Sequence, residues 1–519
     1  MTKKQSTGNQ LKRKPNKRSS LTKQKVATAH ASALSLAEWT VMVYMAGDNN
    51  LAENSVTALE ALRKVLTGNL IHVLAQFDPS DPRVATRRMV MNLNSKKHPH
   101  VRAIQGRANP SAIARDRVWV DEGQIKFSGY KRHFPKILRS GGYETDTADP
   151  KTLFDFVSWT KDNFPASRYM LVLCGHGSGI EEGFLLKDEN PAQSMKLEVL
   201  EEALDQVKDK LGISLEILGM DSCLMSMAEI CLQLHGKAKI LVGSQSLTPN
   251  PGWPYEQIIQ FIYDQGGKVE GKDLAPVIVT KYVNSYVEQA VNTALSTDLS
   301  ALDLDRSPDL TRKIKDLGRA IKRGLKNSDL DFSNAFKDAL VLAHWKAQSY
   351  NGELFVDLHD FCDLLIHHVG GLGASNDKHL AEFSKTCEGV RNSIEEMVLA
   401  TSFCGADYQY SYGVSVYFPW ANIFGYYGNL DFAKKTGADW LDFLIDYVTL
   451  TRRGQRHRDN QKAAYQKKIA SNLALEDIPV KRNRRRVEPI DHGPTESVHS
   501  MRNPPITWGE EWFKGLRQK

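Results

Sequence analysis

The sequence has few cysteines and no long apolar run, and each absence excludes a class of protein. Its 519 residues include six cysteines, at positions 174, 223, 231, 362, 387 and 404. Without a CxxC pair or a Cys/His zinc spacing, they indicate neither a disulfide scaffold nor a zinc site. No stretch of about 18 apolar residues occurs, so we expect no transmembrane helix and no insertion into membranes.

Acidic residues are absent from the first 25 positions, where nine Lys and Arg residues stand. Residues 451–519 hold sixteen basic and eight acidic residues, so the body between the two ends carries a net charge of about −10. We predict a disordered basic tail over 1–34 and a flexible basic tail over 451–519. Nucleic-acid binding through these tails is one alternative function, although aromatic residues for base stacking are absent from 1–38.

A secretory leader is also not indicated. The segment VATAHASALSLAEW (26–39) after the basic start is too polar and too interrupted for the apolar part of a signal peptide. We therefore expect a cytoplasmic protein.

The part of the chain over 35–264 alternates apolar runs with amphipathic segments. Buried strands are predicted from the runs at 39–46, 71–78, 168–177, 215–223 and 238–246. Helices are predicted after the first strand and at 149–165 and 195–211. This alternation predicts an α/β core, a mostly parallel sheet flanked by helices on both faces.

The part of the chain over 265–450 is predicted to be mainly helical. Helical spacing recurs in four segments, the last of which is VRNSIEEMVLA (390–400). A late strand is predicted at 413–420 and a closing helix at 439–448.

Three strand ends carry the residues best suited to chemistry. Open parallel sheets place functional groups just beyond the carboxyl ends of their strands. Here the strands end in CysGlyHisGlySerGly (174–179), AspSerCys (221–223) and GlySerGlnSer (243–246). Cys223 also begins a segment, LMSMAEICLQL, predicted to be a helix whose N-terminus favours the thiolate. His176 and Cys223 can thus face each other as a nucleophilic pair for acyl transfer.

Simpler interpretations remain open at this point. A cysteine at a strand end is often a small buried apolar residue, and a histidine between glycines is often a turn residue. Other catalytic signatures are missing, because the chain has no GxSxG elbow and its GHGSG segment lacks dinucleotide-binding spacing.

Four segments resemble the clostripain family of cysteine peptidases, which belongs to the caspase-like clan with gingipains, legumain and separase. They are WTVMVYMAGDNNL (39–51), residues 144–179, ILGMDSCLMSMAEI (217–230) and GVSVYFPW (413–420). The resemblance runs discontinuously from about residue 39 to about 450 and reaches neither tail. It implies a caspase-like fold and cleavage after Arg or Lys in protein or peptide substrates.

The resemblance assigns a role to each matching position. His176 falls on the catalytic histidine and Cys223 on the nucleophile, and the N–H groups of Gly177 and Cys223 would form the oxyanion hole. Asp221 matches the acid that binds the basic P1 side chain, with helix capping as the alternative. Ser244 and Gln245, followed by PGWPY (251–255), match the wall of the same pocket.

Two further expectations come from the family. Its members commonly cut themselves between the His and Cys blocks, and Lys187 and Lys196 are the candidate sites here. No cofactor is required by the sequence. Calcium enters by family analogy alone, through Asp48, Asn49 and Asn50. No full oxygen-ligand loop is visible there, so a turn and helix cap is the favoured interpretation of these residues.

The sequence thus predicts a cysteine endopeptidase that works through a Cys–His dyad and an acyl-enzyme. A protein that binds basic peptides without cutting them is the alternative within the same fold. Cys174 is expected to be a core strand residue, with an extra thiol near the site as the alternative. The oligomeric state is not indicated.

Overall fold

The computed structural model describes residues 36–65, 67, 70–79, 86–91, 102–103, 145–183, 185–189, 192–372 and 378–452. The two predicted tails therefore lie outside the described residues, except for residues 451 and 452. Within the described residues no helix is both long enough and apolar enough to cross a bilayer.

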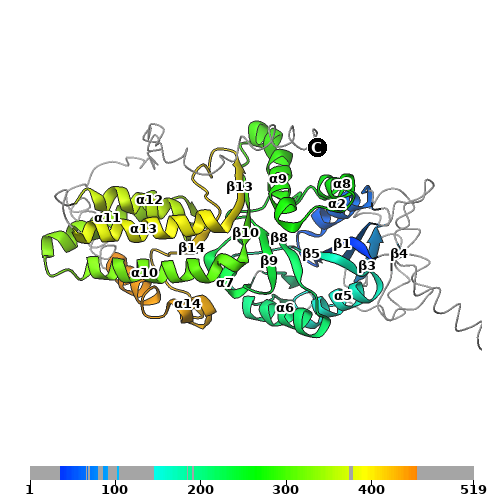
Figure 1. Cartoon of the computed structure of the whole chain (residues 1–519), viewed down its shortest axis with the longest axis horizontal. Coiled ribbons are helices and arrows are strands. Elements are labelled where there is room, and N and C mark those ends of the chain that lie inside the picture. Colours follow the sequence, from blue (N-terminus) through cyan, green and yellow to red (C-terminus); the bar gives the residue numbers. More distant parts are fainter. Residues whose placement is uncertain are drawn as a thin grey trace, which may run out of the picture.

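A nine-stranded sheet forms the centre of the fold, in the order β13-β10-β9-β8-β5-β1-β2-β3-β4 (Figure 1). Its five inner strands run parallel and are β1 (Ala37–Gly47), β2 (Ile71–Pro79), β5 (Ala166–Cys174), β8 (Leu215–Asp221) and β9 (Ala238–Gly243). These are the five strands predicted from apolar runs. Such runs fit a sheet that is covered on both faces, because successive side chains point to opposite sides.

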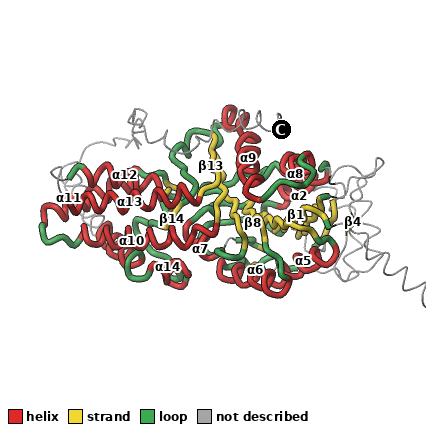
Figure 2. Tube along the Cα trace, in the orientation of Figure 1, coloured by secondary structure: helices red, strands yellow, loops and turns green. Residues whose placement is uncertain are grey.

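Helices cover both faces of the sheet, as Figure 2 shows. One core contains side chains of α2 (Ala52–Arg63), α8 (Tyr255–Asp264) and α9 (Gly271–Thr293). The other contains side chains of α5 (Pro150–Asn163), α6 (Leu197–Leu211) and the short α7 (Ala228–Gln233). The predicted α/β class with helices on both sides of a mostly parallel sheet is confirmed.

The edges of the sheet are antiparallel. On one side β3 (Arg87–Met91) pairs with β2, and β4 (Arg102–Ala103) pairs with β3. On the other, β10 (Thr297–Asp303) pairs with β9, and β13 (Val398–Cys404) pairs with β10. The 265–450 region therefore contains strands in addition to the late one predicted at 413–420, because part of it extends the central sheet.

The rest of this region is helical, as expected. Its helices are α10 (Ser307–Leu325), α11 (Leu330–Lys346), α12 (Leu358–Gly370), α13 (Lys378–Met397) and α14 (Asp431–Thr436). The predicted helix at 390–400 ends at Met397, and β13 begins at the next residue. The late strand is confirmed as β14 (Ser415–Tyr417), which lies in a small sheet with β11 (Ser349–Tyr350) and β12 (Phe355–Asp357). Residues 441–452 form the closing helix.

Gly318 lets the segment before the closing helix lie against α10. A Cβ atom at this position would stand 2.5 Å from the carbonyl oxygen of Asp439 and 3.0 Å from the Cα of Trp440. Both obstacles are backbone atoms, and Trp440 is fully buried. Neither can move away without displacing the closing helix.

We expect Gly318→Ala to lower the free energy of unfolding by about 1–3 kcal/mol, the usual cost of overpacking a core. Gly389→Ala is the matched control. It stands in α13 with its nearest obstacle 3.7 Å away at the end of a lysine side chain. There the better helix propensity of alanine should raise stability by about 0.5–1 kcal/mol. Urea titration of both variants measures the difference, and equal effects would contradict the packing argument.

Candidate active site

The His and Cys segments lie at neighbouring strand ends. In the parallel pairing of β5 with β8, Cys174 is the partner of Asp221, and the Gly175 N–H donates to the Asp221 carbonyl at 3.2 Å. A Cβ atom at Gly177 would stand 2.7 Å from the Cys223 carbonyl oxygen, so the two loops touch through a glycine. The structure thus brings the predicted pair to the same edge of the sheet.

Cys223 does not begin a helix, contrary to the sequence-based expectation. The nearest helix, α7, starts only at Ala228. The chain after Cys223 instead runs beside the end of β9, where the N–H groups of Leu224 and Ser226 donate to the carbonyls of Ser246 and Ser244. Helix-terminus potential therefore does not account for activation of the thiol.

Backbone strain follows directly after Cys223. Leu224 has a φ of 65°, in the left-handed region that costs a bulky residue about 1–2 kcal/mol. It persists because its side chain is buried and its N–H is bonded. The strained turn fixes where the Cys223 side chain leaves the backbone.

The surroundings of Cys223 favour the protonated thiol. Burial raises the pKa of the thiol, and the nearby Asp221 carboxylate raises it further. The Thr248 N–H, which donates to Sγ at 3.3 Å, acts in the opposite direction. A base is therefore needed to make the nucleophile.

His176 has the properties of such a base. Its Nε2 lies 2.7 Å from Oδ1 of Asn50, which stands three residues after the end of β1. Burial lowers the pKa of His176, the Lys187 ammonium lowers it further, and Glu189 opposes them. The imidazole is thus neutral at pH 7, and with its Nε2–H donated to Asn50, Nδ1 is left to accept a proton.

Asn50 is a site residue whose contact the sequence reasoning missed. It was considered there as part of a calcium site or a turn. The turn is observed: Asn49 Oδ1 accepts from the Leu51 N–H at 2.8 Å, and Asn49 Nδ2 donates to the carbonyls of Ala46 and Lys187. In the described part of the chain, no group of three or more His, Cys, Asp or Glu residues is arranged to hold a metal ion. A calcium site at these residues stays a family analogy alone.

Asp221 contacts the 251–255 segment, which follows β9. Its Oδ2 accepts hydrogen bonds from the Tyr255 hydroxyl at 2.7 Å and from the Trp253 N–H at 3.2 Å. Because the helix after Cys223 starts at Ala228, capping of that helix is not its role. The carboxylate faces the 251–255 segment expected beside it, and burial raises its pKa.

Ser244 and Gln245 have no exposed surface. The Ser244 hydroxyl donates to the Ser246 carbonyl, and the Gln245 amide donates to Asp357 at 2.9 Å and accepts from the Gly413 N–H at 2.8 Å. We therefore interpret both as internal supports of the loop beside Cys223 rather than as substrate contacts, which corrects the expectation from sequence.

The two candidate self-cleavage residues differ in their surroundings. Lys187 lies close enough to His176 to lower the pKa of the imidazole, and its side chain pairs with Glu189 at 3.7 Å. Lys196 precedes α6 and pairs with Glu182 at 3.0 Å. Of the two, only Lys187 acts on the His176 imidazole.

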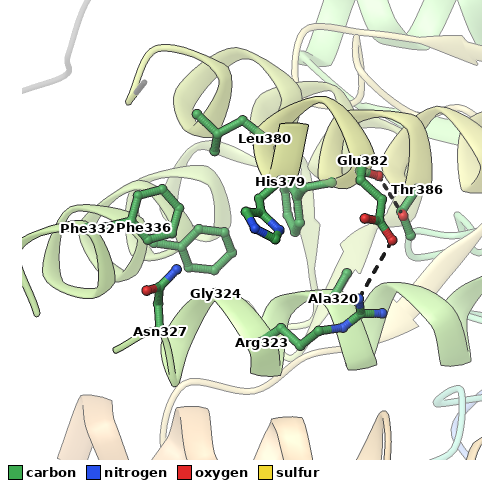
Figure 3. Close-up of a pocket in the computed structure, with 11 residues that line it drawn as sticks. Ala320, Arg323, Gly324, Asn327, Phe332, Phe336, His379, Leu380, Glu382 and Thr386 are labelled. Atoms are coloured by element: carbon green, nitrogen blue, oxygen red, sulfur yellow. Dashed lines mark hydrogen bonds and ion pairs between the residues drawn. The ribbon is translucent and has the colours of Figure 1, made fainter. Parts of the chain in front are cut away.

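A hollow in the helical region lies apart from these strand ends (Figure 3). It is lined by side chains of α10, α11 and α13, among them Phe336 and His379. Arg323 and Glu382 form an ion pair across its rim. It contains none of the residues discussed above, so it adds nothing to the Cys–His site.

The comparisons with known proteins agree with this geometry. The model of the clostripain family, peptidase C11, matches residues 43–422. The chain belongs to the clostripain family. Clostripain of Hathewaya histolytica is 23% identical over 360 residues, which are 62% of this chain and 65% of that protein. The match therefore spans slightly less than two thirds of that relative.

Two solved structures of clostripain-family proteases share the fold. An inactive zymogen C11 protease from Parabacteroides distasonis superposes with a TM-score of 0.52 and 17% identity, over 78% of this chain and 99% of that one. A secreted C11 cysteine protease from Bacteroides thetaiotaomicron, in complex with an irreversible peptide inhibitor, superposes with a TM-score of 0.54 and 15% identity. The superposition covers 78% of this chain and 100% of that one. They confirm the caspase-like fold predicted from the resemblance.

The contact between Asn50 and His176 predicts a change in pH dependence. We expect Asn50→Ala to lower kcat about tenfold with little change in KM, because the imidazole loses the acceptor that orients it. Asn50→Asp places a carboxylate beside the ring and should raise the pKa of His176. Activity that needs the neutral imidazole falls as pH drops through that pKa, so the acid limb of kcat/KM should move to higher pH.

Steady-state hydrolysis of a peptide substrate, followed from pH 4.5 to 8 in wild type and both variants, measures these changes. Thr57→Ala, an exposed helix position whose hydroxyl bonds only its own helix, is the control and should leave the profile unchanged. An Asn50→Asp profile that coincides with wild type would show that the amide does not act on the imidazole.

Proposed function

We propose that this chain is a cysteine endopeptidase that cleaves peptide bonds after Arg or Lys. The observation that carries the proposal is the meeting of His176 and Cys223 at adjacent strand ends, in a chain of the clostripain family. The neutral imidazole and the protonated thiol are the starting states that such a pair requires.

The reaction proceeds through an acyl-enzyme. Nδ1 of His176 takes the Cys223 proton as Sγ attacks the scissile carbonyl carbon, which gives a tetrahedral oxyanion. The oxyanion collapses, the C–N bond breaks, and the imidazolium gives its proton to the leaving amine. Water, deprotonated by His176, then attacks the thioester, and its proton returns to the thiolate as the acid product leaves.

The oxyanion is held by the N–H groups of Gly177 and Cys223 in this proposal. The close approach of Gly177 to the Cys223 peptide supports it, because both amides then belong to one small region beside Sγ. Any side chain at position 177 would separate the two loops.

Asp221 is the proposed partner of the P1 side chain. Its carboxylate stands two residues before the nucleophile, at the end of the same strand. A buried carboxylate gains most from an opposite charge when the ligand's cation enters a site shielded from water. The family resemblance names the same residue for this role.

Hydrolysis of fluorogenic peptides with Arg, Lys, Asp or Leu at P1 tests the proposed activity. We expect cleavage after Arg and Lys, and a loss of at least about 10⁴-fold in kcat for Cys223→Ala and His176→Ala. Cys231→Ala is the matched control, since that thiol is buried and outside the site. Binding of basic peptides by a folded wild type without cleavage would instead favour the silent peptide-binding protein.

Self-processing is a further part of the proposal, and the surroundings of His176 favour Lys187 as the site. Lys187→Ala should keep the chain intact on prolonged incubation, because the enzyme selects a basic residue and this one is near enough to lower the pKa of its own imidazole. Lys196→Ala should be processed like wild type. Gel bands with N-terminal sequencing distinguish the two, and processing that persists in Lys187→Ala would exclude this site.

A further inference from the structure

Hydrogen bonds from within the protein already occupy part of the Asp221 carboxylate. Oδ2 accepts from both the Tyr255 hydroxyl and the Trp253 N–H. An ionised carboxylate offers about two acceptor sites on each oxygen, so Oδ2 has none left. Oδ1 is the oxygen that remains for a ligand.

The wall around Asp221 prevents the carboxylate from turning to present both oxygens. Gly252 packs on it so closely that a Cβ there would lie 2.7 Å from Oδ2 and 2.9 Å from Oδ1. The Tyr286 hydroxyl donates to the Gly252 carbonyl at 2.6 Å and fixes the glycine in place. Tyr255 and Trp253 are themselves 2% and 3% exposed, so neither donor is free to leave.

The side chains of Arg and Lys require different arrangements of hydrogen-bond acceptors. A guanidinium is planar and gains most from a carboxylate that accepts two parallel N–H bonds, one on each oxygen. An ammonium is compact and distributes three donors over separate acceptors. Beside Asp221 these are Oδ1, the lone pairs of the Tyr255 oxygen, and the Cys174 sulfur, which also reaches this carboxylate.

We propose that Tyr255 makes this enzyme prefer Lys over Arg at P1, because its hydroxyl occupies the Asp221 oxygen that a guanidinium would need. This inference rests on the proposed function and names the substrate class more narrowly. Tyr255 is thus a specificity-determining residue that acts through Asp221. Cys174 packs against the core, as expected for a strand residue, and its thiol also lies close enough to the Asp221 carboxylate to lower the pKa of that group.

The experiment compares kcat/KM for two peptides that differ only in Lys or Arg at P1. We expect wild type to favour Lys at least fivefold. Tyr255→Phe frees one of the two acceptor sites of Oδ2 and should reduce this ratio about fivefold, mainly through faster turnover of the Arg peptide. Cys174→Ala should move the ratio in the same direction by less, and it supplies a second test should Tyr255→Phe fold poorly.

Tyr282→Phe is the matched control. It removes a buried hydroxyl from the same helix as Tyr286, but one that bonds the Thr297 hydroxyl rather than Asp221 or Gly252, so the ratio should stay at the wild-type value. Equal or faster cleavage after Arg in wild type, or a ratio unchanged in both Tyr255→Phe and Cys174→Ala, would overturn the inference and leave the proposed function standing. If neither basic peptide is cut by folded wild type, the proposed function fails and this inference fails with it.

Discussion

The parallel pairing of β5 with β8 is the constraint on which the site depends. The backbone ladder sets Cys174 opposite Asp221, and each strand then turns out of the sheet at the same edge. His176 is two residues past one strand end and Cys223 two residues past the other. A shift of one residue in this register would turn the side chains to the other face and separate the base from the nucleophile.

The helical region takes part in holding this arrangement. Asp298 on β10 accepts from the N–H groups of Gln245 and Ser246, each at 2.9 Å, and so fixes the loop beside Cys223. The Ser246 carbonyl in turn accepts from Leu224, whose left-handed backbone needs such support. The strain at the nucleophile is therefore offset by a carboxylate that belongs to a strand the sequence did not reveal.

The local sequence pattern was sufficient to predict the five parallel strands, because a run such as 39–46 is apolar on both faces. It was insufficient where long-range pairing decides the structure. Val398–Ala400 continues a helical spacing yet pairs with β10, and the apolar LMSM after Cys223 reads as a helix yet lies along the end of β9. The bond between Asn50 and His176 joins residues 126 positions apart, which no periodicity in the sequence reports.

Asp221 connects substrate binding with the chemistry. Burial raises the pKa of the Cys223 thiol most, and the negative charge of Asp221 raises it further while the site is empty. In the proposed mode of binding, the P1 cation pairs with this carboxylate and cancels most of its field at Sγ. The thiolate then costs less to form, because two like charges no longer face each other in a buried site. Recognition of the basic side chain thereby removes the smaller of the two contributions that raise the pKa of the nucleophile, and the larger one, burial, leaves the need for His176 as base.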